Sequence, residues 1–338
     1  MSEVQESIRY AGVDDGHFGI KLVGDDFKQF YLPSRIAEGA QIVSLSGGDE
    51  DNVWDTEEGV SYTVSESVSH IDTRFGTYAH SEVNRVLVLH ALYQAGYAGQ
   101  DVRMVSGLPI DDYLVGNKRN DDFIALKVDN LLKKTATNRN LSVKTPHIIG
   151  HSVSMEAVSA FYDLLYKQDG SIDAEFLELA RSGKLAFIDI GGKTTDTAVV
   201  IDGGKNIDKG RSGTSPIGAL TLNQAIETRI KHELNVSQLS SQQIESAART
   251  GTLRMFGAEH DVSKLVNAEK QVLANQIVAE AFRKVGDGSD IERIHFLGGG
   301  SILLHDQLES IYPHAVFVED PQFANARGML KIAKYVKG

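Results

Sequence analysis

The residues Gly192, Lys193 and Thr194 have the types and order that end a P-loop, the phosphate-binding loop of many NTPases. A P-loop also needs a glycine five positions before Gly192 and a helix after the Lys-Thr pair. That position is Phe187, and the residues after the pair are rich in Thr, Val and Ile, which is typical of a strand. The sequence therefore excludes a P-loop and predicts a tight turn between two strands, with Asp189 at its entrance.

A second segment repeats this pattern. Residues 10–23 and 185–200 each contain an apolar strand, an Asp-x-Gly sequence, a few polar residues and a second apolar strand. Asp14 and Asp189 occupy matching positions in the two halves of the chain, so we expect an internal duplication with a cleft between the copies. An Asp-Gly hairpin can be no more than a good turn. Its recurrence in the same frame favours a shared binding function.

Such a pair of turns can bind phosphate through the backbone. Successive amide N–H groups in a tight turn attract anions, and glycine permits positive φ and close approach of an oxygen. A carboxylate beside the turn would repel a triphosphate unless a cation lay between them. Mg²⁺ suits this position because it keeps most of its waters and takes few protein ligands. Lys21 follows the first turn and could reach a phosphate as a point charge.

A third glycine-rich segment is "FLGGGSILL", residues 296–304. Three glycines after a strand and before a helix allow a ligand such as a nucleoside to approach closely. The full G-x-G-x-x-G dinucleotide pattern is absent. A tight strand–helix connection is the alternative interpretation.

Composition limits the classes of partner. The chain has 338 residues, of which 41% are apolar and 24% charged, as expected for about two globular domains. Its formal net charge of -12 argues against non-specific binding to nucleic acid or anionic membrane. Cysteine is absent, which excludes disulfides, thiol catalysis and thiolate metal sites. The polar, acidic N-terminus predicts no signal peptide, and no apolar run is long enough for a membrane span, so we expect a cytoplasmic protein.

Strand and helix patterns alternate along the chain, which predicts an α/β fold in two halves. Strands are expected within 8–24, with a turn at 14–17, and at 101–113, 185–203, 291–297 and near 316. Helices are expected at 80–98, 117–135, 218–235, 241–249, 264–286, after 300 and at the C-terminus. Residues 147–170 are expected to run from a short strand through a polar turn into a helix. A linker is expected at 170–183. We expect domain I to comprise 1–180 and 316–338, with a subdomain inserted at about 30–76, and domain II to comprise 181–315, with a subdomain inserted at about 228–270.

Together these segments resemble the actin-fold ATPases and, within them, the ParM/StbA plasmid-segregation group. The matching segments are "GVDDGHFGIKL" (12–22), "VSGLP" (105–109), "FIDIGGKTTDTAVV" (187–200), "SPIGALTLNQAI" (215–226), "FLGGGSILL" (296–304) and "FANARGMLKIA" (323–333). They cover most of the chain, in order. The resemblance implies an actin-like fold, with two related α/β domains around a nucleotide cleft, each with a smaller inserted subdomain.

The resemblance also implies roles for individual residues. Asp14 and Asp189 would hold Mg²⁺, through water. Relatives place a Gln or Glu that orients the attacking water near the "IIGHS" turn; here the aligned residue is His151, with Glu156 one turn onward to assist. The phosphates would be lined by Asp15, Gly16, His17, Phe18, Lys21, Gly191, Gly192, Lys193 and Thr194, and the adenosine by Gly298, Gly299, Gly300 and Ser301. Catalysis in such a site depends mostly on positioning and electrostatics.

The function implied is slow hydrolysis of ATP, or GTP, with Mg²⁺, coupled to assembly of the chain into dynamic filaments. In the segregation group such filaments move plasmids through a DNA-binding adaptor on a centromere-like site, and the acidic charge disfavours direct DNA binding. The alternatives are a small-molecule kinase of the same fold, which would need an acceptor pocket with a base, and a nucleotide-dependent cell-division or cytoskeletal scaffold. A heat-shock chaperone would need a further peptide-binding domain.

Three other features are expected to have structural roles rather than roles in binding or catalysis. His147 and His151 have the spacing of a helical metal pair, but Ile148-Ile149-Gly150 is a poor helix start. The acidic run at 47–59 is expected to be a solvated loop. The basic amphipathic segment at 329–338 is expected to pack on its own domain rather than on a membrane.

Overall fold

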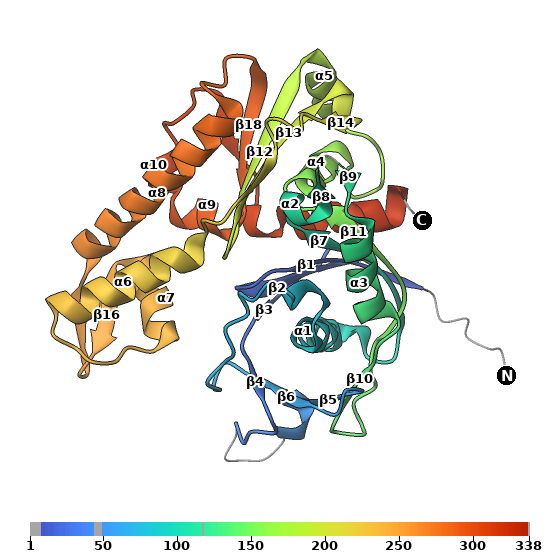
Figure 1. Ribbon diagram of the computed structural model, residues 1–338, viewed down its shortest axis with the longest axis vertical. Coiled ribbons are helices and arrows are strands. Elements are labelled where there is room, and N and C mark those ends of the chain that lie inside the picture. Colours follow the sequence, from blue (N-terminus) through green and yellow to red (C-terminus); the bar gives the residue numbers. More distant parts are fainter. Residues whose placement is uncertain (1–7, 44–48, 117, 337–338) are drawn as a thin grey trace. The chain divides into compact units, whose positions relative to one another are not determined.

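The structure is a computed structural model that describes residues 8–43, 49–116 and 118–336. The chain forms two compact units, coloured along the sequence in Figure 1. Unit 1 comprises Met1–Leu177 and Phe323–Gly338, and unit 2 comprises Glu178–Gln322. Unit 2 is therefore one continuous segment, whereas unit 1 is completed by the C-terminal residues.

Unit 1 is built on a five-stranded sheet in the order β11-β7-β1-β2-β3. Its strands are β1 (Arg9–Asp15), β2 (Gly19–Gly24), β3 (Gln29–Pro33), β7 (Asp101–Leu108) and β11 (His147–Met155). β1, β2 and β3 form antiparallel pairs, whereas β1, β7 and β11 are parallel. The carboxyl ends of the three parallel strands therefore meet at one edge of the sheet.

Helices cover both faces of this sheet. α1 (Glu82–Leu92) and α3 (Asp121–Leu132) lie on one face, where Ala11 and Val13 of β1 join the core. α4 (Val158–Leu165) and α11 (Ala324–Lys331) lie on the other. The backbone of α11 approaches β1 so closely that a Cβ on Gly12 would lie 2.0 Å from the carbonyl oxygen of Ala326. Only glycine permits this contact.

A second, four-stranded sheet in unit 1 has the order β10-β5-β6-β4. Its strands are β4 (Ile36–Glu38), β5 (Val53–Thr56), β6 (Ser61–Val64) and β10 (Ala136–Asn138), and α1 lies between the two sheets (Figure 1). The expected solvated loop at 47–59 is therefore wrong over β5, where Trp54 is fully buried against α1. Acidic neighbours hide this short buried strand in the sequence. Residues 47 and 48 lie outside the described part of the chain.

Unit 2 is built on a six-stranded sheet that begins in the same way as the sheet of unit 1. Its central order is β14-β13-β12-β18-β19, with β15 paired to β13. The strands are β12 (Lys184–Ile190), β13 (Thr195–Ile201), β14 (Asn206–Ile207), β15 (Gly213–Ser215), β18 (Ile291–Leu297) and β19 (Ala315–Phe317). β12 and β13 form an antiparallel hairpin, and β18 is the parallel neighbour of β12. The predicted repeat of a hairpin in each half is confirmed.

The helices of unit 2 agree with the expected segments. α6 (Ala219–Glu233), α7 (Ser241–Thr250) and α8 (Ser263–Val285) confirm the three predicted helices, and a hairpin of β16 (Thr252–Met255) and β17 (Ala258–Asp261) joins the last two. Two short helices, α9 (Gly299–Leu303) and α10 (His305–Leu308), follow β18. None of the helices in the described ranges is both long enough and apolar enough to cross a membrane.

Two predictions about connecting segments are wrong. The expected linker at 170–183 contains the helix α5 (Ala174–Ser182), which starts where Asp173 accepts a hydrogen bond from the backbone N–H of Phe176 (3.0 Å). The helix expected from 117 starts later, at Asp121, after the short elements α2 (Ile110–Tyr113), β8 (Leu114–Val115) and β9 (Lys118–Arg119). In both cases a capping side chain, rather than a glycine, marks the boundary.

Candidate functional site

The first predicted turn lies between β1 and β2. Asp14 pairs with Lys21 and Asp15 with Ile20, so the turn itself is Gly16, His17 and Phe18, and both aspartates end β1. Successive side chains of a strand point to opposite faces. The side chains of Asp14 and Asp15 therefore lie on opposite faces of the sheet.

The Asp14 carboxylate forms an ion pair beside the turn. Lys21 Nζ lies 3.2 Å from Asp14 Oδ2, and both side chains are largely buried. A Cβ on Gly16 would lie 3.1 Å from the same Nζ, so the lysine amine lies against the turn. The two strands that flank this turn thus place one negative and one positive charge beside it.

The Asp15 carboxylate is bound inside unit 1, contrary to its expected place along the phosphates. Lys127 Nζ of α3 lies 2.9 and 2.7 Å from its two oxygens, and Asn84 Nδ2 of α1 donates to it at 2.7 Å. Both Asp15 and Lys127 are buried. The side chain of Asp15 therefore holds two helices to β1, and only its backbone faces the turn.

His151 does not lie beside Asp14, contrary to the role expected from the resemblance. It pairs with Met104 in the middle of β11, and its Nε2 lies 2.9 Å from Oγ of the buried Ser106. The register of β1, β7 and β11 sets it three residues back from Asp14, or about 10 Å along the strands. The alternation of side chains also sets it on the opposite face. The sequence alone could not reveal the register in which β1, β7 and β11 pair.

Glu156 comes directly after β11 and lies at the same edge and face as Asp14. Its N–H donates to Leu108 O (2.9 Å), and a Cβ on Gly107 would lie 3.0 Å from Glu156 Cγ. The next residue, Ala157, has φ +61°, and its N–H donates to Asn325 Oδ1 at 3.1 Å. A positive φ at alanine is uncommon and needs such support. The structure thus brings Glu156, rather than His151, to the carboxyl edge of the sheet.

The second turn, Gly191 to Thr194, lies between β12 and β13. Asp189 is paired directly with Asp196 across this hairpin, and both carboxylates are buried, at 5% and 1% exposure. This is the position of the Asp14–Lys21 pair in the first hairpin. Asp196 accepts hydrogen bonds from the hydroxyls of Thr214 (2.5 Å) and Thr194 (3.3 Å). Asp196 is not among the predicted site residues, although its spacing from Asp189 equals the spacing of Lys21 from Asp14.

The start of α6 holds the carbonyl groups of the second turn. The N–H groups of Ala219 and Leu220 donate to Gly191 O (2.9 Å) and Gly192 O (2.8 Å). The C=O and N–H of a trans peptide point in opposite directions, so the N–H groups of Gly192 and Lys193 are directed away from α6. Convergent amides of this kind attract anions.

Gly218 makes this contact possible, and it is a site residue that sequence analysis did not single out. A Cβ at this position would lie 2.5 Å from Gly192 O and 2.6 Å from the Lys193 carbonyl carbon. The segment "SPIGALTLNQAI" pointed to this region, but not to its contact with the turn.

The glycine run after β18 packs against the second hairpin. Leu297 pairs with Asp189, and a Cβ on Gly298 (φ +82°) would lie 2.3 Å from Asp189 Oδ1. A Cβ on Gly300 would lie 2.3 Å from Ile190 Cγ2, whereas a Cβ on Gly299 would meet nothing within 4 Å. The hydroxyl of the buried Ser301 donates to Gly298 O (2.8 Å). Gly298, Gly300 and Ser301 therefore shape the turn, and Gly299 leaves room for a ligand.

The pair His147 and His151 forms no metal centre. Both residues belong to the strand β11, where the helical spacing does not apply. Across residues 8–43, 49–116 and 118–336, no three His, Cys, Asp or Glu side chains gather in a way that could hold a metal ion by themselves.

Two protein-family models match the chain. The model of "Plasmid segregation protein ParM, N-terminal" matches residues 11–165, and that of "Archaeal actin homologue MreB-like, C-terminal" matches residues 187–310. The first contains the hairpin of Asp14, and the second contains the hairpin of Asp189 and the glycine run. The comparison with curated proteins gave no match.

Solved structures match nearly the whole chain. A 15-stranded ParM filament from Clostridium botulinum has 20% identity and a TM-score of 0.77, over 97% of this chain and 99% of that one. The archaeal actin homolog Ta0583 has 21% identity and a TM-score of 0.78, over 96% and 99%, and its complex with ADP has 20% identity and a TM-score of 0.76 over the same shares. At such identities the likeness establishes the fold, which is actin-like. The two family matches agree with this fold, since residues 11–165 are similar to the ParM family and residues 187–310 to the MreB-like archaeal actin homologues.

Proposed function

We propose that this protein is an ATPase that binds Mg²⁺–ATP through its two glycine turns and assembles into filaments. The observation that carries the proposal is the second turn. An aspartate precedes it, α6 binds two of its carbonyl groups, and its amides are directed away from that helix. The first turn repeats the design with Asp14 and adds the positive charge of Lys21.

An adenine nucleotide is the ligand that we propose. The archaeal actin homolog of the same fold has been solved with ADP. The space at Gly299 would accept the nucleoside, because a ligand can approach glycine backbone closely there. GTP is the alternative nucleotide.

Magnesium suits the carboxylates of the two hairpins. Asp189 and Asp196 oppose each other across the second hairpin, and both are buried. Their hard oxygen atoms are the donors that Mg²⁺ prefers, and the ion needs few protein ligands. We propose that Asp189 and Asp14 hold it through water, with Asp196 orienting Asp189. When bound, the ion would neutralise charge on the phosphates.

Hydrolysis would depend on Glu156. Its carboxylate follows β11 at the edge where Asp14 ends β1, and it can accept a proton from an attacking water. The turn amides and Lys21 would stabilise negative charge that develops on the phosphate oxygens. Each step needs positioning rather than covalent chemistry by the protein.

Filament assembly and plasmid segregation complete the proposal. A matching structure is that of a ParM filament, and the N-terminal family model is that of a plasmid segregation protein. The net charge of -12 would make direct DNA binding weak, so we propose that a separate DNA-binding adaptor links the filament to DNA. We also propose a cytoplasmic location.

Light scattering tests the proposal. Scattering should rise after addition of ATP with Mg²⁺, decay as ATP is consumed, and stay flat with ADP. Asp189→Ala should abolish phosphate release and filament turnover, because it removes the carboxylate before the second turn. Flat scattering with ATP would reject filament assembly, and normal turnover in the variant would reject the role of Asp189.

A further inference from the structure

Two residues with hydroxyl groups, one near each end of the inserted module, contact the first turn. The inserted module is the segment 34–76, which carries β4, β5 and β6. Ser34 Oγ donates to Gly16 O (2.9 Å), and Thr73 Oγ1 donates to His17 O (2.8 Å). The N–H of Ser34 donates to Phe18 O (3.1 Å). All three carbonyl groups of the turn therefore accept hydrogen bonds from the two ends of the module.

These contacts set the direction of the turn amides. In a planar trans peptide the C=O of one residue and the N–H of the next point in opposite directions. Because the carbonyls of Gly16 and His17 point to Ser34 and Thr73, the N–H groups of His17 and Phe18 point to the other side. Ser34 and Thr73 are each only 4% exposed, so solvent has little access to these bonds.

Thr73 binds the turn a second time. The backbone carbonyl of Thr73 lies 2.8 Å from His17 Nδ1. A carbonyl oxygen can only accept, so Nδ1 carries the proton and the imidazole ring is fixed in one tautomer. The His17 ring also packs against Tyr78, just beyond the module, with the ring centroids 4.6 Å apart and the ring planes tilted by 37°. The backbone carbonyl and the side chain of His17 are thus both held by Thr73.

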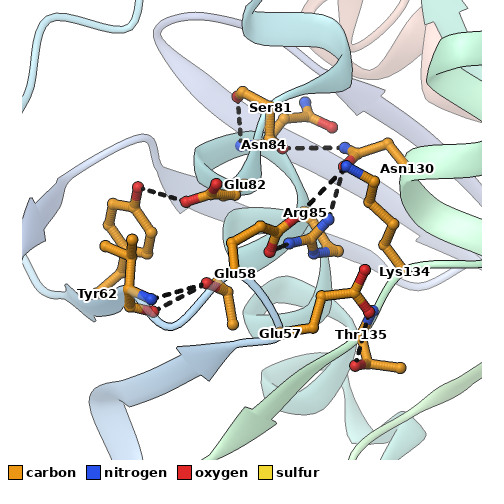
Figure 2. Close-up of polar contacts among 12 residues, drawn as sticks. Glu57, Glu58, Tyr62, Ser81, Glu82, Asn84, Arg85, Asn130, Lys134 and Thr135 are labelled. Carbon is orange, nitrogen blue, oxygen red and sulfur yellow. Dashed lines mark hydrogen bonds and ion pairs between the residues drawn. The ribbon is translucent and has the colours of Figure 1, made fainter.

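The module itself is anchored at its far side. Arg85 of α1 forms an ion pair with Glu58, in the turn between β5 and β6, and donates to Asn130 of α3 (2.9 Å). Glu57 accepts hydrogen bonds from Thr135 beyond α3, and Tyr62 of β6 donates to Glu82 of α1 (3.0 Å), as Figure 2 shows. The module is therefore held by α1 and by the segment that follows α3, and its base can act as a support.

The second turn has the same arrangement from a different source. There, backbone N–H groups of α6 bind the carbonyls of Gly191 and Gly192. In the first turn, two hydroxyls and one amide of the inserted module do so. Two turns of one molecule thus have their carbonyl groups held on one side and their amides left for the other.

We propose that Ser34 and Thr73 are positioning residues for the nucleotide phosphates. They hold the carbonyls of the first turn away from the phosphates and direct its amides toward them, and they link that turn to the inserted module. This inference rests on the proposed function, because it takes the ligand to be a nucleotide.

The test is isothermal titration of the full-length protein with ADP in the presence of Mg²⁺. Thr73→Val keeps the shape of the side chain and removes the hydroxyl, and Ser34→Ala removes the other hydroxyl. Each variant should bind ADP about five- to tenfold more weakly, the equivalent of one hydrogen bond. Thr73→Ser, which keeps the hydroxyl, should restore binding.

Thr63→Val is the matched control. Thr63 lies in the same module, is fully buried, and donates its hydroxyl to Gly39 O (2.7 Å), away from the turn. Its loss should lower the melting temperature as much as Thr73→Val does, while leaving ADP affinity unchanged. Ser34→Ala decides the question if Thr73→Val fails to fold.

The outcomes separate the two proposals. Equal ADP affinity in Thr73→Val, Ser34→Ala and Thr63→Val would overturn the positioning role and leave the proposed function standing. Failure of the wild-type protein to bind ADP would overturn the proposed function and the positioning role with it.

Discussion

At the scale of residues, chemistry depends on which face of a strand a side chain occupies. Asp14 and Asp15 are neighbours in sequence, yet one pairs with Lys21 at the turn and the other with Lys127 in the core. His151 and Glu156 are separated in the same way, so that Glu156 alone shares the edge and face of Asp14. Residue type is therefore a weaker guide to function here than strand register.

Substitution of each candidate base in turn tests whether Glu156, rather than His151, acts in hydrolysis. Glu156→Gln should lower ATP turnover by about 10²-fold or more, because it removes the proton acceptor, while ATP affinity stays close to that of the wild type. His151→Gln should keep nearly full turnover. Phosphate release under single-turnover conditions measures both. A loss of turnover confined to the His151 variant would return the catalytic role to the histidine.

A buried histidine makes the stability of unit 1 depend on pH. Burial lowers the pKa of His90 to about 4, and its Nδ1 accepts a hydrogen bond from Trp54 Nε1 (3.1 Å). The unfolded histidine takes up a proton below its ordinary pKa of about 6.5, so stability is complete above that pH and falls as the pH drops toward 4. The loss should reach about 2 kcal/mol at pH 5.

Urea unfolding at pH 7 and pH 5 measures this loss. Trp54 is the only tryptophan in the chain, so its fluorescence reports on unit 1. His90→Gln keeps an acceptor for Trp54 but cannot be protonated in this range. The variant should therefore lose about 2 kcal/mol less between the two pH values. An identical loss in both proteins would assign the pH dependence to other groups.

At the scale of elements, each turn is supported by a segment distant in sequence. α6 supports the second turn and the inserted module supports the first. Local sequence predicted the hairpins, the glycine runs and the helices of unit 2, because composition and periodicity encode them directly. It could not predict contacts such as Gly218 against Gly192, or the pairing of β10 with β5, since these are set only when distant segments pack. The same reason explains why the sequence alone could not place His151 relative to Asp14.

Gly218→Ala tests the support of the second turn. Its Cβ would collide with Gly192 O and force the turn or α6 to move, which typically costs about 1–3 kcal/mol. ADP affinity should fall more than tenfold, as measured by titration. Gly210→Ala is the control in the same unit, because its Cβ would meet only Asp208 Oδ1, at an ordinary 3.6 Å. Equal affinity in the two variants would exclude the supporting role of Gly218.

At the scale of the whole molecule, unit 1 is built from both ends of the chain. α11 packs against Gly12 of β1, and its Arg327 and Lys331 form buried ion pairs with Asp163 of α4 at 2.7 and 2.8 Å. Breaking a buried pair by removing one partner costs about 3–5 kcal/mol. The C-terminal helix is therefore an essential part of unit 1.

Truncation tests this dependence. A chain that ends at Gln322 should leave unit 1 unfolded, whereas the fragment Glu178–Gln322 should keep its fold, because that unit is continuous. Hydrogen exchange measured by mass spectrometry would show fast exchange in β1, β7 and β11 of the truncated chain and slow exchange in β12 and β18. Slow exchange throughout the truncated chain would contradict the prediction.

The close approach of α11 to Gly12 has a consequence during synthesis. The ribosome makes β1 long before α11, so the sheet face that α11 covers stays uncovered in the nascent chain until α11 emerges. Unit 2 can fold on emergence, whereas unit 1 must wait until α11 has left the ribosome. The sheet of unit 1 is thus completed only after the whole of unit 2 has been made.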